Sequence, residues 1–460
     1  MTPQETVERA LALSRADDCI VIVEESSNAN LRWANNTLTT NGLTHSRQVT
    51  VIATVDSGSG AAAGVISRSG VDGDALEALV CEAETTARAA SSAEDARPLV
   101  RENGSSSDWE APPAETSMAV FSSFAPALGE AFGSASSAGN AYFGFAEHNL
   151  TSTYLGSSTG LRRRYDQPTG RLELNAKSAD YGRSAWSGIA TRDFKDVDIP
   201  KLDAELAERL SWAERRVELP AGRYETLLPP SAVADLMISL YQSATARAAH
   251  EGRSVFSCPG GGTRVGDRLS SMSVTLSSDP AAPELECAPF VIAQASSEES
   301  SVFDNGLPLA ETRWIDGGVL RALMQTRHSA ELTGLPVTPG TDNLVLSGPE
   351  GGRLLSEMVA TTKRGLLLTC LWYIREVDPQ TLLLTGLTRD GVYLVEDGEV
   401  TGVVNNFRFN ESPVDMLARI TEIGSTVRTL PREQSDYFPR AAMPTLRVEE
   451  FNMSSVSQAL

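Results

Sequence analysis

The chain has 460 residues, of which 41% are hydrophobic and 22% charged, a balance typical of a globular protein with two or three domains. Its 60 acidic and 39 basic side chains give a formal net charge of −21, which argues against nucleic acid and anionic membranes as partners. No apolar stretch approaches the ~20 residues that span a bilayer, and residues 1–16 do not resemble a secretion signal. We expect a cytoplasmic protein.

The opening ninety residues alternate helical and strand patterns. Apolar residues recur at helical spacing in two stretches, and β-branched runs bounded by Ser, Asn and Gly lie between them. We expect, in order, a helix at 3–15, a strand at 19–24, a turn at 26–30, strands at 31–36, 47–55 and 61–67, and a helix at 72–90. Helices that flank paired strands predict an α+β unit, not a repeating βαβ series.

A loop rich in Ser, Asp and Pro, residues 91–116, precedes a run of alternating strand and turn signals. These signals predict a meandering antiparallel sheet with strands at 142–147, 151–157, 161–165, 171–177 and 185–191. A helix at 201–216 follows, and Pro220-Ala-Gly222 marks a domain boundary. We therefore expect an N-terminal α+β domain of residues 1–220.

The second half, residues 221–460, is predicted to be a β-rich domain around one central helix at 231–249. Ser231 follows two prolines as an expected N-cap, and the apolar residues after it recur at helical spacing. Small side chains then fill the turns from Ser243 to Ala249, so this face can be approached closely. Shorter helices are expected at 354–360 and 412–423, with strands at 224–228, 273–276, 290–293, 312–316, 319–325, 343–346, 365–375, 382–387, 391–396, 399–404 and 443–448.

The sequence offers few groups for local catalysis. Its four histidines are well separated, and no HExxH, GxSxG or Walker motif occurs. The five cysteines are scattered without a CxxC pair, so neither a disulfide framework nor a zinc knuckle is indicated. Cys258 lies near His250 but is expected to be a structural thiol, and Cys19 and Cys370 are expected core residues.

A group of ionic residues at the end of the central helix is the main candidate site. Arg247 lies one turn before Glu251, and His250 and Arg253 flank that glutamate. One interpretation is a solvated helix end with an i,i+4 ion pair. The other is that Arg247 or Arg253 holds the carboxylate of a peptide or small ligand in a cleft.

Several stretches, in order along the chain, resemble the TldD/PmbA family, specifically its PmbA (TldE) branch as found in actinobacteria. They include Ala249-His-Glu-Gly-Arg-Ser254 and Phe303-Asp-Asn-Gly-Leu-Pro308. The other matching segments are 224–236, 265–269, 365–369, 377–391 and 393–400. The resemblance is most specific over residues 223–405. Toward the N-terminus it rests only on the order of the expected strands and helices.

This resemblance implies a two-domain TldD/PmbA-like fold and a subunit of a two-component metallopeptidase. In such pairs the TldD-type subunit carries a zinc-binding HExxxH motif on the central helix, where the metal activates water and the glutamate is the general base. The PmbA-type subunit shares the fold, lacks the motif and completes a chamber that admits unfolded peptides. Zinc is therefore expected in the partner subunit.

The chain departs from the zinc motif at every functional position. When Glu251-Gly252 is used as the anchor, the six motif positions are Ser243-Ala-Thr-Ala-Arg-Ala248. Ser243 and Ala248 then stand where the two histidines would be, and Ala244 stands where the glutamate would be. We expect no metal, no catalytic residue and no cofactor in this chain.

Three functional hypotheses follow. The first is a metal-free subunit of a heterodimeric zinc peptidase acting on small or unfolded peptides, with Arg247, His250, Glu251 and Arg253 as candidate substrate contacts. The second is a subunit of a related amide hydrolase in a natural-product biosynthetic pathway. The third is a binding or regulatory module without proteolysis, which the lack of a zinc-bearing partner would favour.

Overall fold

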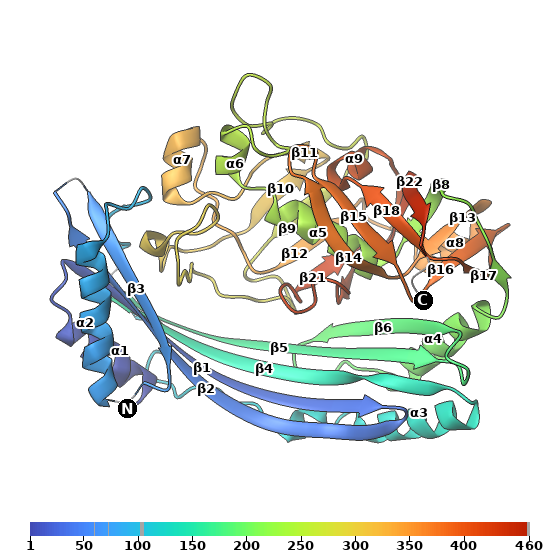
Figure 1. Cartoon of the computed structure of the whole chain (residues 1–460), viewed down its shortest axis with the longest axis horizontal. Coiled ribbons are helices and arrows are strands. Elements are labelled where there is room, and N and C mark those ends of the chain that lie inside the picture. Colours follow the sequence, from blue (N-terminus) through green and yellow to red (C-terminus); the bar gives the residue numbers. More distant parts are fainter. Residues whose placement is uncertain (59, 72, 102–104, 458–460) are drawn as a thin grey trace.

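One long, curved antiparallel sheet is built by the strands between residues 18 and 191, in the order β3-β2-β1-β4-β5-β6 (Figure 1). The computed structural model describes residues 1–58, 60–71, 73–101 and 105–457. The strands are β1 (Asp18–Ala34), β2 (Thr37–Asp56), β3 (Ala61–Ser69), β4 (Ala141–Ser157), β5 (Arg162–Lys177) and β6 (Ser184–Thr191). The predicted antiparallel meander is confirmed for β4, β5 and β6.

The strands are longer than the sequence predicts, and the turn expected at 26–30 is wrong. Those residues lie inside β1, which pairs with β2 on one side and β4 on the other. Their polar side chains find partners across the sheet: Asn28 donates to Glu147 at 2.7 Å, for example. The chain turns instead at Asn35 and Asn36, which both adopt the positive φ values that asparagine tolerates. In the same way, the four strands predicted between 142 and 177 merge into β4 and β5.

Four helices cover one face of this sheet. They are α1 (Pro3–Leu13), α2 (Gly73–Ala89), α3 (Ala125–Ser137) and α4 (Ile199–Trp212), and only α3 was not predicted. Leu31 and Trp33 of β1 pack under α3, and Val21 and Val23 pack under α1 and α2. The alternate residues of β1, such as Ile20, point to the other face and belong to one buried apolar cluster with Phe303 from the second half of the chain. The second half thus lies against the concave face of the sheet (Figure 1).

The second half contains two further sheets. The larger has the order β14-β15-β18-β22-β8-β13-β16-β17-β7, with β19 paired to β22, and the smaller has the order β11-β10-β9-β12-β21-β20. The strands are β7 (Arg216–Val217), β8 (Gly222–Leu228), β9 (Thr275–Ser278), β10 (Thr312–Asp316), β11 (Val319–Leu320), β12 (Leu344–Ser347), β13 (Arg364–Leu368), β14 (Leu371–Asp378), β15 (Leu383–Thr388), β16 (Val392–Glu396), β17 (Glu399–Val404), β18 (Phe407–Glu411), β19 (Ile420–Ile423), β20 (Val427–Thr429), β21 (Ala441–Met443) and β22 (Leu446–Val456). The helices are α5 (Pro230–Gln242), α6 (Ala246–His250), α7 (Arg327–Thr333), α8 (Leu355–Ala360) and α9 (Pro413–Ala418). The α+β fold class is confirmed.

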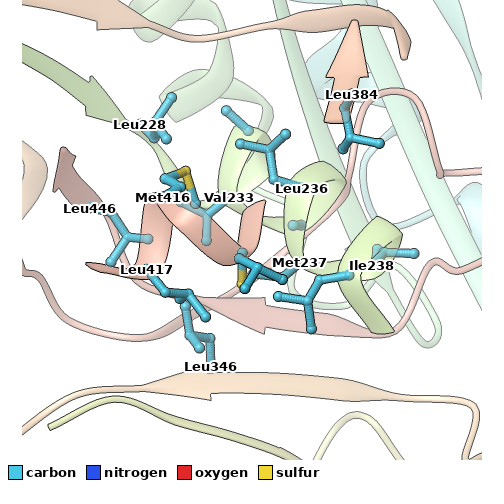
Figure 2. Packing of buried hydrophobic residues seen from close by; sticks show 14 of the residues in the cluster. Leu228, Val233, Leu236, Met237, Ile238, Leu346, Leu384, Met416, Leu417 and Leu446 are labelled. Carbon is cyan, nitrogen blue, oxygen red and sulfur yellow. The ribbon is translucent and has the colours of Figure 1, made fainter. Parts of the chain in front are cut away.

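Helix α5 is the centre of this half. Ten of its residues, from Ala232 to Tyr241, are buried, which fits a helix that is apolar on nearly all sides. Figure 2 shows Val233, Leu236 and Met237 among leucines and Met416 contributed by the surrounding sheets and by α9. The expected N-cap is wrong: Pro229 is the cap residue, and the Ser231 hydroxyl donates to the carbonyl of Thr369 instead.

Several predicted elements of this half are shorter in the structure. The helix expected at 412–423 ends at Ala418, and β19 follows. Ser412 is its N-cap, and the Ser412 hydroxyl accepts a hydrogen bond from the Asp415 amide. The strand expected at 365–375 divides into β13 and β14. Only an isolated bridge forms in the stretch predicted as a strand at 290–293. A tight turn at Asp397-Gly398 joins β16 to β17, with positive φ at both residues.

The boundary predicted at residue 220 stays a prediction. The strands from 18 to 191 share one sheet, whereas β7, just before the boundary, pairs with β17 of the second half. In the described part of the chain, no helix combines the length and the apolar character needed to cross a membrane.

Candidate functional site

The central helix is interrupted where the sequence predicts the vacated metal motif. α5 ends at Gln242 and α6 begins at Ala246, so the single helix expected over 231–249 is wrong. Thr245 is extended, and the backbone here pairs with Met324: Met324 N donates to the Ala244 carbonyl at 2.7 Å, and Ala246 N donates to the Met324 carbonyl at 3.0 Å. The small side chains predicted to allow close approach thus admit a neighbouring backbone.

The three degenerate motif positions provide no donor set that fits zinc. Ala244 and Ala248 are buried methyl groups, and the Ser243 hydroxyl donates to Glu376 at 3.5 Å. In the described residues, no three His, Cys, Asp or Glu side chains lie together so as to hold a metal ion. That this chain binds no metal stays a prediction.

Three of the four candidate contact residues lie together in an ionic cluster. Arg247 donates to Glu251 at 3.0 Å and to Glu94 at 2.9 Å. Arg253 donates to Glu251 at 2.6 Å and to Glu298 at 2.8 Å. We call these five residues the ionic cluster.

The charges of the ionic cluster are paired with one another, and Glu94 also lies 3.6 Å from Nε2 of His328. Hydrogen bonds from Arg253 and Arg247 lower the pKa of Glu251. Two arginines face three glutamates, so the carboxylates of the cluster compete with a ligand carboxylate for the arginine donors. The predicted Arg247–Glu251 ion pair is confirmed, but the role of the cluster in substrate binding stays a prediction.

His250 lies apart from the ion pairs of the cluster. It is exposed and, with Glu251, lines a hollow of about 470 Å³ whose other wall is the glycine-rich loop after Cys258. The Cys258 thiol donates to the Thr263 carbonyl at 3.2 Å, which is a structural contact within that loop.

A cleft that the sequence did not reveal lies beside the end of α5. Its volume is about 420 Å³, and we call it the α5 cleft. Aromatic and apolar side chains form much of its wall, and Glu299, Asp304 and Asp342 add carboxylates. The apolar and aromatic lining residues are Tyr241, Ala288, Phe290, Val291, Ile292, Leu309, Met324, Pro339, Tyr437 and Phe438.

Asp235 connects α5 to the loop that carries two of these aromatic residues. It is fully buried, and its carboxylate accepts hydrogen bonds from the backbone amides of Arg432 (3.2 Å), Glu433 (2.9 Å) and Gln434 (3.1 Å). Burial raises the pKa of Asp235 to about 8, and the three amides act in the opposite direction. The anchored loop then brings Tyr437, which is 79% exposed, to the cleft. A lone Asp in an apolar helix was the one sequence signal for this arrangement.

The fold and the site define an α+β chain whose central helix is interrupted beside a cleft. Residues 221–455 match the family model of the PmbA/TldA metallopeptidase C-terminal domain. The match spans more than half of the chain, and the chain belongs to this PmbA/TldD family. The resemblance to the TldD/PmbA family noted in the sequence is thereby confirmed. A search of curated proteins finds no match.

Three solved structures share the fold over nearly the whole chain. TldE from Thermococcus kodakarensis has a TM-score of 0.78 at 16% identity, covering 98% of this chain and 99% of its own. A "putative modulator of a DNA gyrase" from Thermotoga maritima has a TM-score of 0.74 at 18% identity, with coverage of 98% and 99%. A similarly described protein from Bacteroides thetaiotaomicron has a TM-score of 0.76 at 16% identity, with coverage of 99% and 98%. At these identities the likeness shows the fold alone.

Proposed function

We propose that this chain is the metal-free subunit of a heterodimeric TldD/TldE-like zinc metallopeptidase that cleaves small or unfolded peptides. The observation that carries the proposal is the interrupted helix: the motif positions 243–248 hold no zinc ligand and no general base, and the helical backbone that would present them is broken. A metallopeptidase fold without its metal motif has a role in catalysis only beside a subunit that supplies the metal.

The α5 cleft is the part of this subunit that would contact peptide. It lies at the end of α5, next to the interrupted motif, and combines aromatic walls with carboxylates. Such a surface suits an extended peptide, because aromatic side chains bind apolar residues and carboxylates accept hydrogen bonds from backbone amides and side-chain amines. Tyr437 is well placed for this contact because most of its surface is free.

Co-expression with TldD-type zinc subunits tests the proposal. The expected result is a stable complex that contains zinc and cleaves unstructured peptides, with activity lost when a chelator removes the metal. The chain alone is expected to contain no stoichiometric zinc and to cleave nothing. Failure to bind any TldD-type subunit, with no peptide cleavage in any mixture, would sink the proposal in favour of a binding module.

A further inference from the structure

The outer edge of β2 is open along half of its length. β1 pairs with β2 over its whole course from Thr37, but β3 pairs only with Gln48–Asp56. Residues 37–46 therefore have no neighbouring strand on their outer side among the described residues. In Figure 1 this edge runs along the bottom of the molecule, on the side away from α6 and the second half of the chain.

The composition of this edge is not that of a protected edge. Residues 37–46 read Thr-Leu-Thr-Thr-Asn-Gly-Leu-Thr-His-Ser, without Lys, Arg, Asp, Glu or Pro, in a chain that is 22% charged. Proteins ordinarily guard long edge strands with charges or prolines, because the unpaired N–H and C=O groups otherwise recruit another strand. At about 3.4 Å per residue the open stretch is roughly 30 Å long.

Two exposed leucines lie on this edge and on one face of it. Leu43 is opposite Ala29 in β1, and Leu38 is opposite Trp33. Leu38 and Thr40 pair with the consecutive residues Trp33 and Arg32, so Thr39 is an extra, bulged residue that returns Leu38 to the face of Leu43. Ala29 and Trp33 are buried under α3, whereas Leu38 is 53% and Leu43 is 43% exposed. The apolar core beneath α3 thus extends to the edge of the sheet, where Leu38 and Leu43 are exposed to solvent.

The edge is complementary to itself. In an antiparallel pair about a two-fold axis at Asn41, Asn41 lies opposite its own copy and Thr40 lies opposite Gly42. With Thr39 bulged, Leu43 then lies opposite Leu38 of the copy, on the face that both leucines already share. No charged side chain within the segment opposes the approach of a second copy, and the remaining charges are screened beyond about 8 Å at physiological ionic strength.

We propose that residues 37–46 pair antiparallel with the same residues of a second copy of this chain. The two six-stranded sheets then form one continuous sheet across the two-fold axis. This inference does not depend on the proposed peptidase role. The pairing edge lies away from α6, so it leaves the face of α6 free for a zinc-bearing subunit (Figure 1).

The test is the molar mass of the purified full chain in solution, measured by light scattering over a range of concentrations. The chain is expected to have twice its mass of 49.1 kDa. Leu43→Glu, which brings carboxylates into the paired edge, is expected to be monomeric. The matched control is Leu332→Glu on α7, because Leu332 is 44% exposed and lies away from the edge, and this variant is expected to stay dimeric.

A second measurement keeps the proposal falsifiable if Leu43→Glu folds poorly. In a Cys81→Ser background, which removes an exposed thiol, Asn41→Cys is expected to form a disulfide-linked dimer on mild oxidation, because the axis places the two side chains together. Ser46→Cys is the control and is expected to cross-link far less. A monomeric wild-type chain, a dimer that survives Leu43→Glu, or equal cross-linking of both cysteines overturns the proposal. The proposal is also overturned if the chain is monomeric and the edge variants disrupt only its complex with a zinc subunit. In that case the edge binds the zinc subunit and not a second copy of this chain.

Discussion

The guanidinium carbon of Arg432 lies 4.5 Å from the ring centroid of Trp372 in β14. Arg432 also lies 5.1 Å from the ring of Trp186 in β6, and it forms an ion pair with Glu173 in β5. One side chain in the loop after β20 therefore joins the long N-terminal sheet to the second half of the chain. The same loop is held by Asp235 of α5 and lines the α5 cleft, so the junction and the cleft share one support.

Replacing Arg432 tests this junction. Glu173 has a side chain only 4% exposed, so Arg432→Ala leaves a buried carboxylate without its partner and is expected to lower the free energy of unfolding by roughly 3–5 kcal/mol. Arg432→Lys keeps the charge but loses the planar stacking, and we expect a smaller loss of about 1–2 kcal/mol. Urea unfolding followed by tryptophan fluorescence measures both. The control is Arg313→Ala, since Arg313 is 57% exposed, and a loss for Arg432→Ala as small as that of the control would contradict the account.

Asp235 predicts a pH dependence of stability. Its pKa is raised to about 8 in the folded chain, against about 3.9 for an unfolded Asp. Between these values the folded chain holds a proton that the unfolded chain has released, so the free energy of unfolding falls as pH rises from about 4 to about 8. The stabilising contribution is complete below the unfolded pKa and is lost as pH rises through the folded pKa.

Asp235→Asn removes this titration while keeping a side-chain carbonyl for the loop amides. Urea unfolding at several pH values across this window is expected to show a shallower decline for the variant than for the wild type. Asp267→Asn at an exposed site serves as the control and is expected to keep the wild-type slope. Parallel slopes for wild type and Asp235→Asn would refute the assignment.

Tyr437 tests the α5 cleft as the peptide contact. If the cleft binds substrate, Tyr437→Ala in the complex with a zinc subunit is expected to raise KM for an unstructured peptide about tenfold, since a lost aromatic contact of ~1.4 kcal/mol corresponds to that factor. Tyr181→Ala, at an exposed tyrosine on the distant β5–β6 turn, is expected to leave KM unchanged. Equal effects of the two variants would remove the cleft from the proposal.

A substitution in the ionic cluster is expected to affect peptide binding without a large effect on the stability of the fold. Arg253 is 46% exposed, so Arg253→Ala is expected to change the free energy of unfolding by less than ~1 kcal/mol. If the cluster holds a peptide carboxylate, the same variant raises KM for a peptide with a free C-terminus but leaves KM unchanged for its amidated form. A KM unaffected for both peptides would assign the cluster to the solvated end of α6 alone.

The sequence predicted the fold class, most helices and the family because these rest on apolar periodicity and on several ordered segments. It misplaced the turn at 26–30 because Ser26, Asn28 and their neighbours have turn composition, yet these two side chains form hydrogen bonds with residues of the neighbouring strand β4. It missed the break at Thr245 because small residues continue a helical pattern. The hydrogen bonds that replace the helical ones there are formed with the backbone of Met324, which is distant in the sequence. Long-range pairing decided both cases.

The candidate site was predicted in part for the same reason. The Arg247–Glu251 pair is local, at i,i+4 spacing, and was readable from the sequence. Glu94 and Glu298 bind the arginines of the ionic cluster from distant segments of the chain, and no local sequence pattern predicts these two contacts. The α5 cleft depends on Asp235 anchoring a loop nearly 200 residues downstream, which spacing alone does not show.

Metal content and peptide hydrolysis of the purified chain, measured with and without a TldD-type subunit, test the central claim most directly. The account predicts no stoichiometric zinc and no cleavage for the chain alone, and chelator-sensitive cleavage once the zinc-bearing subunit is added. Stoichiometric zinc in the isolated chain together with hydrolysis in the absence of any partner would contradict it.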